Sequence, residues 1–243
     1  AGATILNRGA ERYGFKKSRE LSHLFLTRPL FVRDKSRHAV DNYLQFARYF
    51  GCSPEAVEFP LYIPPEDVYY IEGILRREGI KPGDLIIFVS ATARWRSKFW
   101  QQGAFARLGD ELVGRYGAKL VFSGLPSEAD YLQGIKAMMH EDALIMAGRT
   151  SIKQFLALVQ YAHLYVGVDS GAMHAAAALG IPVVALFGPS NPRWIGPYGQ
   201  EQGIVRVDLP CAPCNRRDCS DNSCMLRITT DMVLQKIEER MPL

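Results

Sequence analysis

The residues with the clearest chemical potential lie in the segment 168–174, which reads Val-Asp-Ser-Gly-Ala-Met-His. Asp169, Ser170 and Gly171 follow an apolar, β-rich segment and are residue types that start helices. We expect a strand, a tight turn and a short helix, with Asp169 as the N-cap. The free backbone N–H groups of Ser170, Gly171 and Ala172 would then form an anion-binding site.

Two side chains of this segment add polar groups suited to a sugar or a phosphate. Asp169 could accept hydrogen bonds from sugar hydroxyls as well as capping the helix. For His174, the pattern favours a structural hydrogen bond over direct contact with a ligand. A plain capped helix start is the alternative for the whole segment, but the carboxyl end of a strand in an open α/β sheet is where ligands bind. The segment therefore predicts binding of a phosphorylated small molecule.

Lys98 and Glu128 each follow a predicted strand and could contact the same ligand. A lysine is a point charge suited to a diphosphate leaving group, on which negative charge builds as the bond breaks. A solvated surface lysine is the alternative for Lys98. Glu128 resembles the ribose-binding acid of nucleotide folds. It is equally consistent with an acid stabilised by the helix dipole in a first turn.

Four of the five cysteines are close together in the sequence, with spacings of two, four and four residues. Four such thiols could bind zinc. We favour free, packed thiols and assign no metal, with zinc as the alternative. Cys52 stands apart, and we expect it to be buried. The four clustered residues are Cys211, Cys214, Cys219 and Cys224.

The positions of all these candidate residues depend on a regular series of predicted strands and helices. From Asp84 onward, apolar segments alternate with helical ones, which predicts a parallel, doubly wound α/β sheet. Segments that are apolar throughout are typical of strands buried on both faces. We predict strands at 85–89, 119–122, 144–146, 163–168 and 183–187. We predict helices at 101–116, 127–139, 151–160 and after Ser170, with a last helix capped by Thr230. Residues 1–84 are less regular, with helical periodicity at 38–50 and 66–78.

Composition narrows the class of protein and of partner. The 243 residues are enough for one large domain or two modest ones. The net charge of +4 is too small to indicate nucleic acid, but it suits an anionic substrate or a negatively charged membrane face. A basic stretch could meet acidic sugars and lipid phosphates, or be a solvated face; it comprises Arg8, Arg12, Lys16, Lys17 and Arg19.

Three motifs, in this order, resemble those of glycosyltransferase family 9, the lipopolysaccharide heptosyltransferases. The first is Ser97-Lys98-Phe99-Trp100. The second is the segment 169–174, with Ala-Leu-Gly-Ile-Pro at 178–182 and Leu-Phe-Gly-Pro at 186–189. The third is Cys211-Ala212-Pro213-Cys214 followed by Cys219 and Cys224-Met225, and a weaker fourth is 38–43 followed by Gly51. The resemblance spans most of the chain and is strongest from about Leu85 onward.

The resemblance implies a GT-B architecture, in which two Rossmann-like halves face each other across a cleft. Residues 85–228 would be the donor-binding half, and residues 1–84 a remnant of the acceptor-side half with a linker. The helix in 229–243 would pack back toward the N-terminal half. The implied reaction is inverting transfer of heptose from ADP-heptose to the Kdo and heptose inner core of lipopolysaccharide, with no cofactor required.

The resemblance also implies roles for individual residues. Lys98 would stabilise the departing ADP. Gly148 lies in the loop where the family holds adenine by backbone groups, and Thr92 lies where Ser90-Ala91-Thr92 replaces the family's usual glycine. The donor-binding candidates are Thr92, Lys98, Glu128, Gly148, Asp169, Ser170, Gly171, Ala172 and His174.

The sequence departs from the family at its start. The family begins with a strand and a Gly-rich loop whose Asp acts as the base, and no segment here matches them. We expect the general base to lie outside this chain, with about 100 residues, the size of a small domain, missing. We also expect a cytoplasmic location at the inner membrane and no nucleic-acid partner. The alternatives are a GT-B enzyme that uses another nucleotide sugar such as a UDP-sugar, a non-catalytic nucleotide-sugar-binding module, or a zinc-stapled interaction domain.

Overall fold

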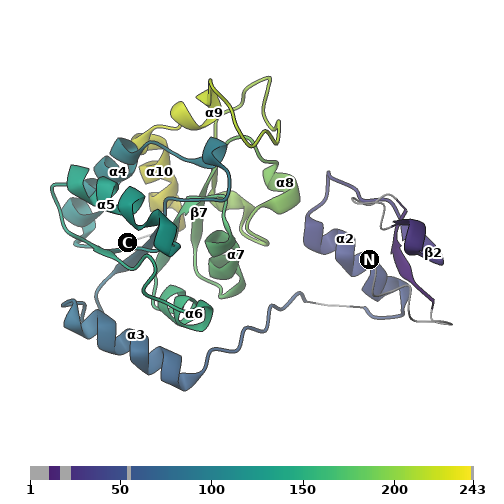
Figure 1. Cartoon of the computed structure of the whole chain (residues 1–243), viewed down its shortest axis with the longest axis horizontal. Coiled ribbons are helices and arrows are strands. Elements are labelled where there is room, and N and C mark those ends of the chain that lie inside the picture. Colours follow the sequence, from purple (N-terminus) through teal and green to yellow (C-terminus); the bar gives the residue numbers. More distant parts are fainter. Residues whose placement is uncertain (1–10, 17–22, 54–55, 242–243) are drawn as a thin grey trace. The chain divides into compact units, whose positions relative to one another are not determined.

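The computed structural model describes residues 11–16, 23–53 and 56–241, and the chain divides into two compact units, Ala1–Val57 and Glu58–Leu243 (Figure 1). This division lies earlier than the boundary at residue 84 that the sequence suggests. The reason is that α3 (Pro65–Arg77) packs against α6 (Ile152–Gln160) and joins a core of the second unit.

The first unit contains a short parallel pair of strands, β1 (Tyr13–Phe15) and β2 (Arg28–Phe31), and the helix α2 (Ala39–Tyr49). Edge-to-face ring contacts of Phe46 with Phe15 and Phe31 pack α2 against both strands. The helix matches the periodicity predicted at 38–50. Of the basic stretch, Arg8, Lys17 and Arg19 lie outside the described residues, while Arg12 Nε donates to the Phe25 carbonyl at 2.6 Å.

The second unit is built on a parallel sheet of six strands in the described part of the chain, with the order β5-β4-β3-β6-β7-β8. The predicted doubly wound α/β sheet is therefore confirmed. Each predicted strand is present to within a residue, and β8 is an addition that the sequence did not indicate. The strands are β3 (Ile86–Ser90), β4 (Lys119–Phe122), β5 (Ala143–Ile145), β6 (Leu164–Val168), β7 (Val183–Phe187) and β8 (Ile204–Arg206).

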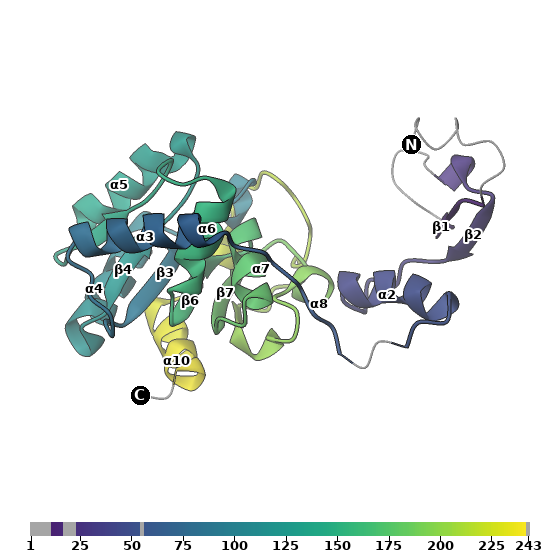
Figure 2. The same ribbon diagram turned by 90° about the horizontal axis from the view of Figure 1, so that it is seen from below.

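Helices cover both faces of this sheet (Figure 2). One apolar core lies beneath α3, α6 and α7, and the other beneath α4, α5 and α10. Along β3, Ile86 and Phe88 belong to the first core while Ile87 and Val89 belong to the second, as the two-residue period of a strand requires. The remaining helices are α4 (Gln102–Tyr116), α5 (Ala129–Met138), α7 (Gly171–Ala178), α8 (Pro192–Ile195), α9 (Ser223–Leu226) and α10 (Thr230–Arg240).

Helix ends follow local capping rules, with small differences from the predictions. Ser151 and Gln154 form the expected capping box at the start of α6. The cap of α10 is Thr229, whose hydroxyl accepts the Met232 N–H, and Thr230 is the first helical residue. The last helix contacts α4, β7 and β8, all within Glu58–Leu243.

Candidate functional site

The predicted ligand site lies at the carboxyl edge of β3 and β6. The strand order reverses between these two strands, and the crevice outside such a switch point is where open α/β sheets bind ligands. The loop after β3 carries the buried Thr92 and, in the short 3-10 helix η2 (Arg96–Lys98), Lys98. The residue directly after β6 is Asp169. The topology and the sequence motif therefore point to the same edge.

Among the residues that the structure describes, no side chain caps α7, the helix that begins at this edge. Ser170 is its N-cap residue, in extended conformation, but its hydroxyl makes no hydrogen bond to the helix. That hydroxyl lies 3.2 Å from the Ser90 hydroxyl and 3.2 Å from the Tyr165 hydroxyl. Gly171 is exposed, and a Cβ built on it would have no atom within 4 Å. The start of α7 therefore lacks a side-chain cap and borders open space at Gly171, as an anion site requires.

Tyr165 anchors this turn from beneath. Its side chain is fully buried in β6, and burial raises the pKa of its phenol well above the usual value. The phenol is therefore neutral at physiological pH, and it donates to the Val168 carbonyl at 3.2 Å. The hydroxyl network keeps the Ser170 side chain under the turn and away from the helix amides.

Asp169 is not the N-cap that the sequence predicted. Its Oδ2 accepts a hydrogen bond from Lys98 Nζ at 2.6 Å and a second from the Ser190 hydroxyl. The Asp169 side chain is 4% exposed and that of Lys98 13% exposed, so this is a largely desolvated ion pair. Leaving a buried carboxylate without a charged partner costs more free energy than leaving a helix without a capping side chain. Asp169 therefore pairs with Lys98.

The same pair fixes the position of Lys98. Its Nζ lies 4.7 Å from the centre of the Trp95 ring, a cation–π distance. An ammonium has three hydrogens to donate, and the Asp169 carboxylate takes one of them. Lys98 is therefore held beside the start of α7 with donors left for an anion. Sequence reasoning missed Ser190 and Trp95, although Ser190 follows β7 at the same edge of the sheet.

Two further candidates lie together at the ends of the neighbouring strands β4 and β5. Glu128 Oε2 accepts the Leu125 N–H at 2.6 Å, which closes the turn after β4. Gly148 has a positive φ of 71° and donates its N–H to the Gly124 carbonyl. A Cβ on Gly148 would lie 3.0 Å from the Cα of Pro126, so only glycine allows this close approach. The remaining candidate, His174, is exposed in the first turn of α7.

The four clustered cysteines do not converge into a metal-binding group. Within the described residues, no set of three or more His, Cys, Asp or Glu side chains is arranged to hold a metal ion. Cys224 is buried, Cys214 is half-buried, and Cys211 and Cys219 are exposed. The geometry therefore gives the zinc alternative no support. The expectation for Cys52 is wrong, since this thiol is exposed.

Cys224 should be the least reactive thiol of this cluster. Burial, followed by the charges of the three neighbouring cysteines, raises the pKa of Cys224 above its usual value, so less thiolate is present at a given pH. We expect iodoacetamide at pH 8 to label it roughly tenfold more slowly than Cys211 or Cys219. Peptide mass spectrometry over time measures the rates, and labelling in urea is the control. Equal rates in the folded protein would contradict the burial of Cys224.

No described helix combines the length and the apolar character that crossing a membrane requires.

Comparisons with known proteins agree on one family. A family model described as glycosyltransferase family 9 (heptosyltransferase) matches residues 3–225. The lipopolysaccharide core heptosyltransferase OpsX of Haemophilus influenzae is 27% identical over 213 residues, which are 84% of this chain and 59% of that protein. The chain therefore spans about three fifths of the length of this curated relative.

Solved structures give the same result for the fold. A family 9 glycosyl transferase from Veillonella parvula superposes with a TM-score of 0.79 at 24% identity, over 96% of this chain and 67% of that one. The heptosyltransferase WaaC of E. coli, solved with ADP, superposes with a TM-score of 0.68 at 22% identity, over 94% of this chain and 65% of that one. With the six-stranded parallel sheet, these likenesses show the GT-B fold.

Proposed function

The chain belongs to glycosyltransferase family 9, the heptosyltransferases, and from this premise we propose that it binds ADP-heptose at the carboxyl edge of β3 and β6. In this proposal it acts as an inverting glycosyltransferase that adds heptose to the lipopolysaccharide inner core. The observation that carries the proposal is the uncapped start of α7 beside the Lys98–Asp169 pair at the switch point of the sheet.

The diphosphate of the donor lies, in this proposal, against the amides of Ser170, Gly171 and Ala172. The dipole of α7 favours an anion there by about 0.3–1 kcal/mol. Negative charge grows on the leaving ADP as the bond to the sugar breaks. Lys98 is already oriented by Asp169 and needs no reorganisation to stabilise that charge.

The other candidates serve the remaining parts of the donor. Thr92 contacts a phosphate, and Asp169 and His174 lie where the sugar hydroxyls would be. Glu128 binds the ribose with the carboxylate oxygen that does not close its turn, and the backbone around Gly148 holds the adenine. The contact between the Gly148 and Glu128 loops supports a single nucleoside site across β4 and β5.

The first unit serves the acceptor in this proposal. Ala1–Val57 carries ten Lys and Arg residues against five Asp and Glu, whereas Glu58–Leu243 carries nineteen against twenty. The net positive charge of the chain therefore resides in the first unit. Such a unit suits the Kdo carboxylates and the phosphates of lipid A at the cytoplasmic face of the inner membrane.

Calorimetric titration tests the nucleotide and the sugar together. ADP-heptose, ADP and a UDP-sugar are titrated into the wild-type protein and into Asp169→Ala. We expect ADP-heptose and ADP to bind, the UDP-sugar to bind at least about tenfold more weakly, and Asp169→Ala to lose affinity for ADP-heptose. Preference for the UDP-sugar would favour another GT-B enzyme. Binding of ADP-heptose without heptose transfer to lipid A carrying Kdo would favour a non-catalytic module.

A further inference from the structure

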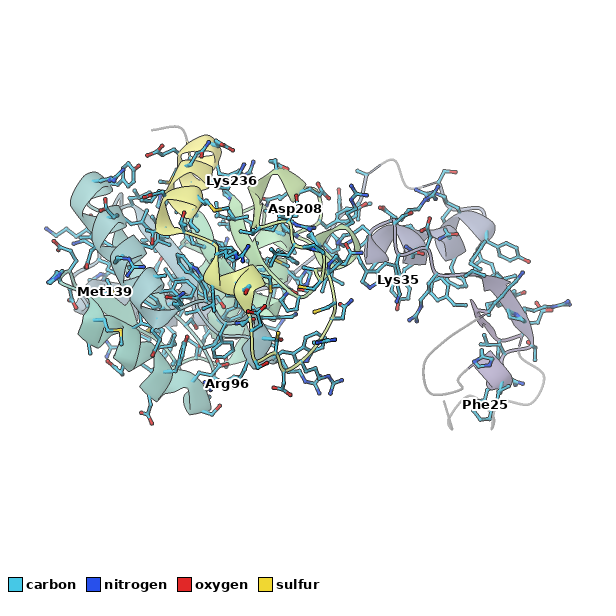
Figure 3. The ribbon with its side chains drawn as sticks, turned by 90° about the horizontal axis from the view of Figure 1, so that it is seen from above. Phe25, Lys35, Arg96, Met139, Asp208 and Lys236 are labelled. Carbon is cyan, nitrogen blue, oxygen red and sulfur yellow. The ribbon has the colours of Figure 1, made fainter. Side chains whose placement is uncertain are left out.

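Two loops far apart in the sequence are joined beside the donor site. Ser97, 3% exposed, donates its hydroxyl to the Arg216 carbonyl at 2.7 Å and its N–H to the Arg217 carbonyl at 3.4 Å. The Asn215 N–H donates to the Pro189 carbonyl at 2.7 Å, which ties the second loop to the end of β7. In Figure 3 the labelled Arg96 lies at the same end of the unit as the loop that leads into α9.

A pocket opens where these two loops meet. Its volume is about 490 Å³, within the range of sites that bind small molecules. One wall is the η2 turn, in which Ser97 directly precedes Lys98, so the pocket adjoins the proposed donor site. Five residues line it: Arg96, Ser97, Asp218, Cys219 and Ser220.

The surroundings of this pocket are strongly basic and are not neutralised internally. Arg94, Arg96, Arg216 and Arg217 belong to the two loops, and Asp218 is the one acid among the lining residues. In the described part of the chain, none of these four arginines pairs with a carboxylate. Some surface arginines elsewhere do have such partners, as in the Arg115–Glu111 and Arg149–Glu78 pairs.

An aromatic ring links this basic cluster to the donor site. The guanidinium of Arg217 lies 5.6 Å from the centre of the Trp95 ring, and the Lys98 ammonium lies 4.7 Å from the same centre. Arg96 stacks in turn on Phe99, at 5.6 Å. Ring contacts of this kind hold cations in place without neutralising them. The charge at the pocket thus stays available to an anion.

We propose that this pocket binds one anionic group of the acceptor sugar, a carboxylate or a phosphate, in addition to those assigned to the first unit, while the donor occupies the start of α7. The inference rests on the proposed function, because only a donor at the neighbouring site makes the pocket an acceptor site. Guanidinium groups suit such oxyanions because they donate paired hydrogen bonds in a fixed plane. Asp218 and Ser220 are suited to the hydroxyls of the same sugar.

Titration in the presence of saturating ADP tests the inference. The probes are Kdo, which carries a carboxylate, glucose 6-phosphate, which carries a phosphate, and neutral glucose. The proteins are the wild type, Arg96→Gln/Arg217→Gln, and a control with the same loss of charge on α3, Arg76→Gln/Arg77→Gln. We expect one or both anionic sugars to bind and glucose not to bind. The pocket variant should bind the anionic sugar at least about tenfold more weakly, and the control should bind like the wild type.

The relative affinities of the wild type for Kdo and glucose 6-phosphate identify whether a carboxylate or a phosphate is the ligand. Equal binding of an anionic sugar to the wild type and the pocket variant would overturn the inference, as would absence of such binding with ADP in place. A loss of ADP affinity in the pocket variant would also overturn it, since the arginines would then belong to the donor site. Failure of ADP to bind the wild type is a separate result that removes the proposed function and this inference with it.

Discussion

Asp169→Asn should lower the free energy of unfolding by about 3 kcal/mol, the usual cost of leaving one charge of a desolvated pair without its partner. The substitution keeps the shape of the side chain and leaves the Lys98 ammonium, 13% exposed, without a carboxylate. Chemical denaturation followed by tryptophan fluorescence measures the change. All three tryptophans, Trp95, Trp100 and Trp194, lie in Glu58–Leu243, so the signal reports the unit that holds the pair.

The double variant Asp169→Asn/Lys98→Met separates an unpaired charge from a general loss of packing. It leaves neither charge in the site, so it should be more stable than Asp169→Asn alone by about 1–3 kcal/mol. Glu111→Gln is a matched control, because it removes one carboxylate from the exposed pair with Arg115 and should cost less than about 1 kcal/mol. A double variant no more stable than Asp169→Asn would show that the ion pair is not desolvated.

Lys98→Met should weaken ADP binding by roughly 10- to 100-fold, the value of a hydrogen bond to a charged group. Methionine keeps the length of the side chain and an apolar stem beside Trp95, but it removes the charge that we assign to the diphosphate. It also leaves the Asp169 carboxylate without its cation, and the repulsion between this carboxylate and the diphosphate adds to the loss. Calorimetric titration of ADP at two salt concentrations measures the effect. The affinity of the variant should also depend less steeply on salt than that of the wild type, because one ionic contact is missing.

Adenosine supplies the control for this prediction. It lacks phosphates, so its affinity should be the same for the wild type and Lys98→Met when it is measured by competition with a nucleotide. An equal loss for adenosine and ADP would mean that the substitution disturbs the whole site. An unchanged affinity of Lys98→Met for ADP would show that Lys98 does not bind the donor.

Much of the sheet could be predicted from the sequence because its strands are buried on both faces. Such strands are continuous apolar segments, and the predicted bounds of β4 and β7 agree with the structure. The short β8 was not predicted, because Ile204–Arg206 is only partly buried at the edge of the sheet and ends in an arginine, so it lacks a continuous apolar pattern. The helix start after β6 was also predictable, since a break after an apolar strand is a local signal.

The partners of the site residues were not predictable, because they depend on contacts between distant segments. A local rule predicts Asp169 as an N-cap. The fold, however, brings Lys98 from 71 residues earlier in the chain to the Asp169 carboxylate. The ion pair is the stronger interaction, so it determines the role of Asp169. Ser190 and the Trp95 ring join the site for the same reason, through loops that follow other strands. Sequence patterns therefore located the edge of the sheet, while the electrostatics of that edge required the structure.

The central claim is that the first amides of α7 hold the diphosphate, and Gly171→Pro tests it most directly. Proline fits the first position of a helix, the extended Ser170 suits the residue before proline, and the space around Gly171 is open. The affinity for ADP is measured by calorimetric titration. Gly171→Ala keeps the amide hydrogen, so its affinity should be within about threefold of that of the wild type. For Gly171→Pro, which lacks that hydrogen, the affinity should be at least about tenfold weaker. Equal ADP affinity in Gly171→Pro and Gly171→Ala would contradict the claim.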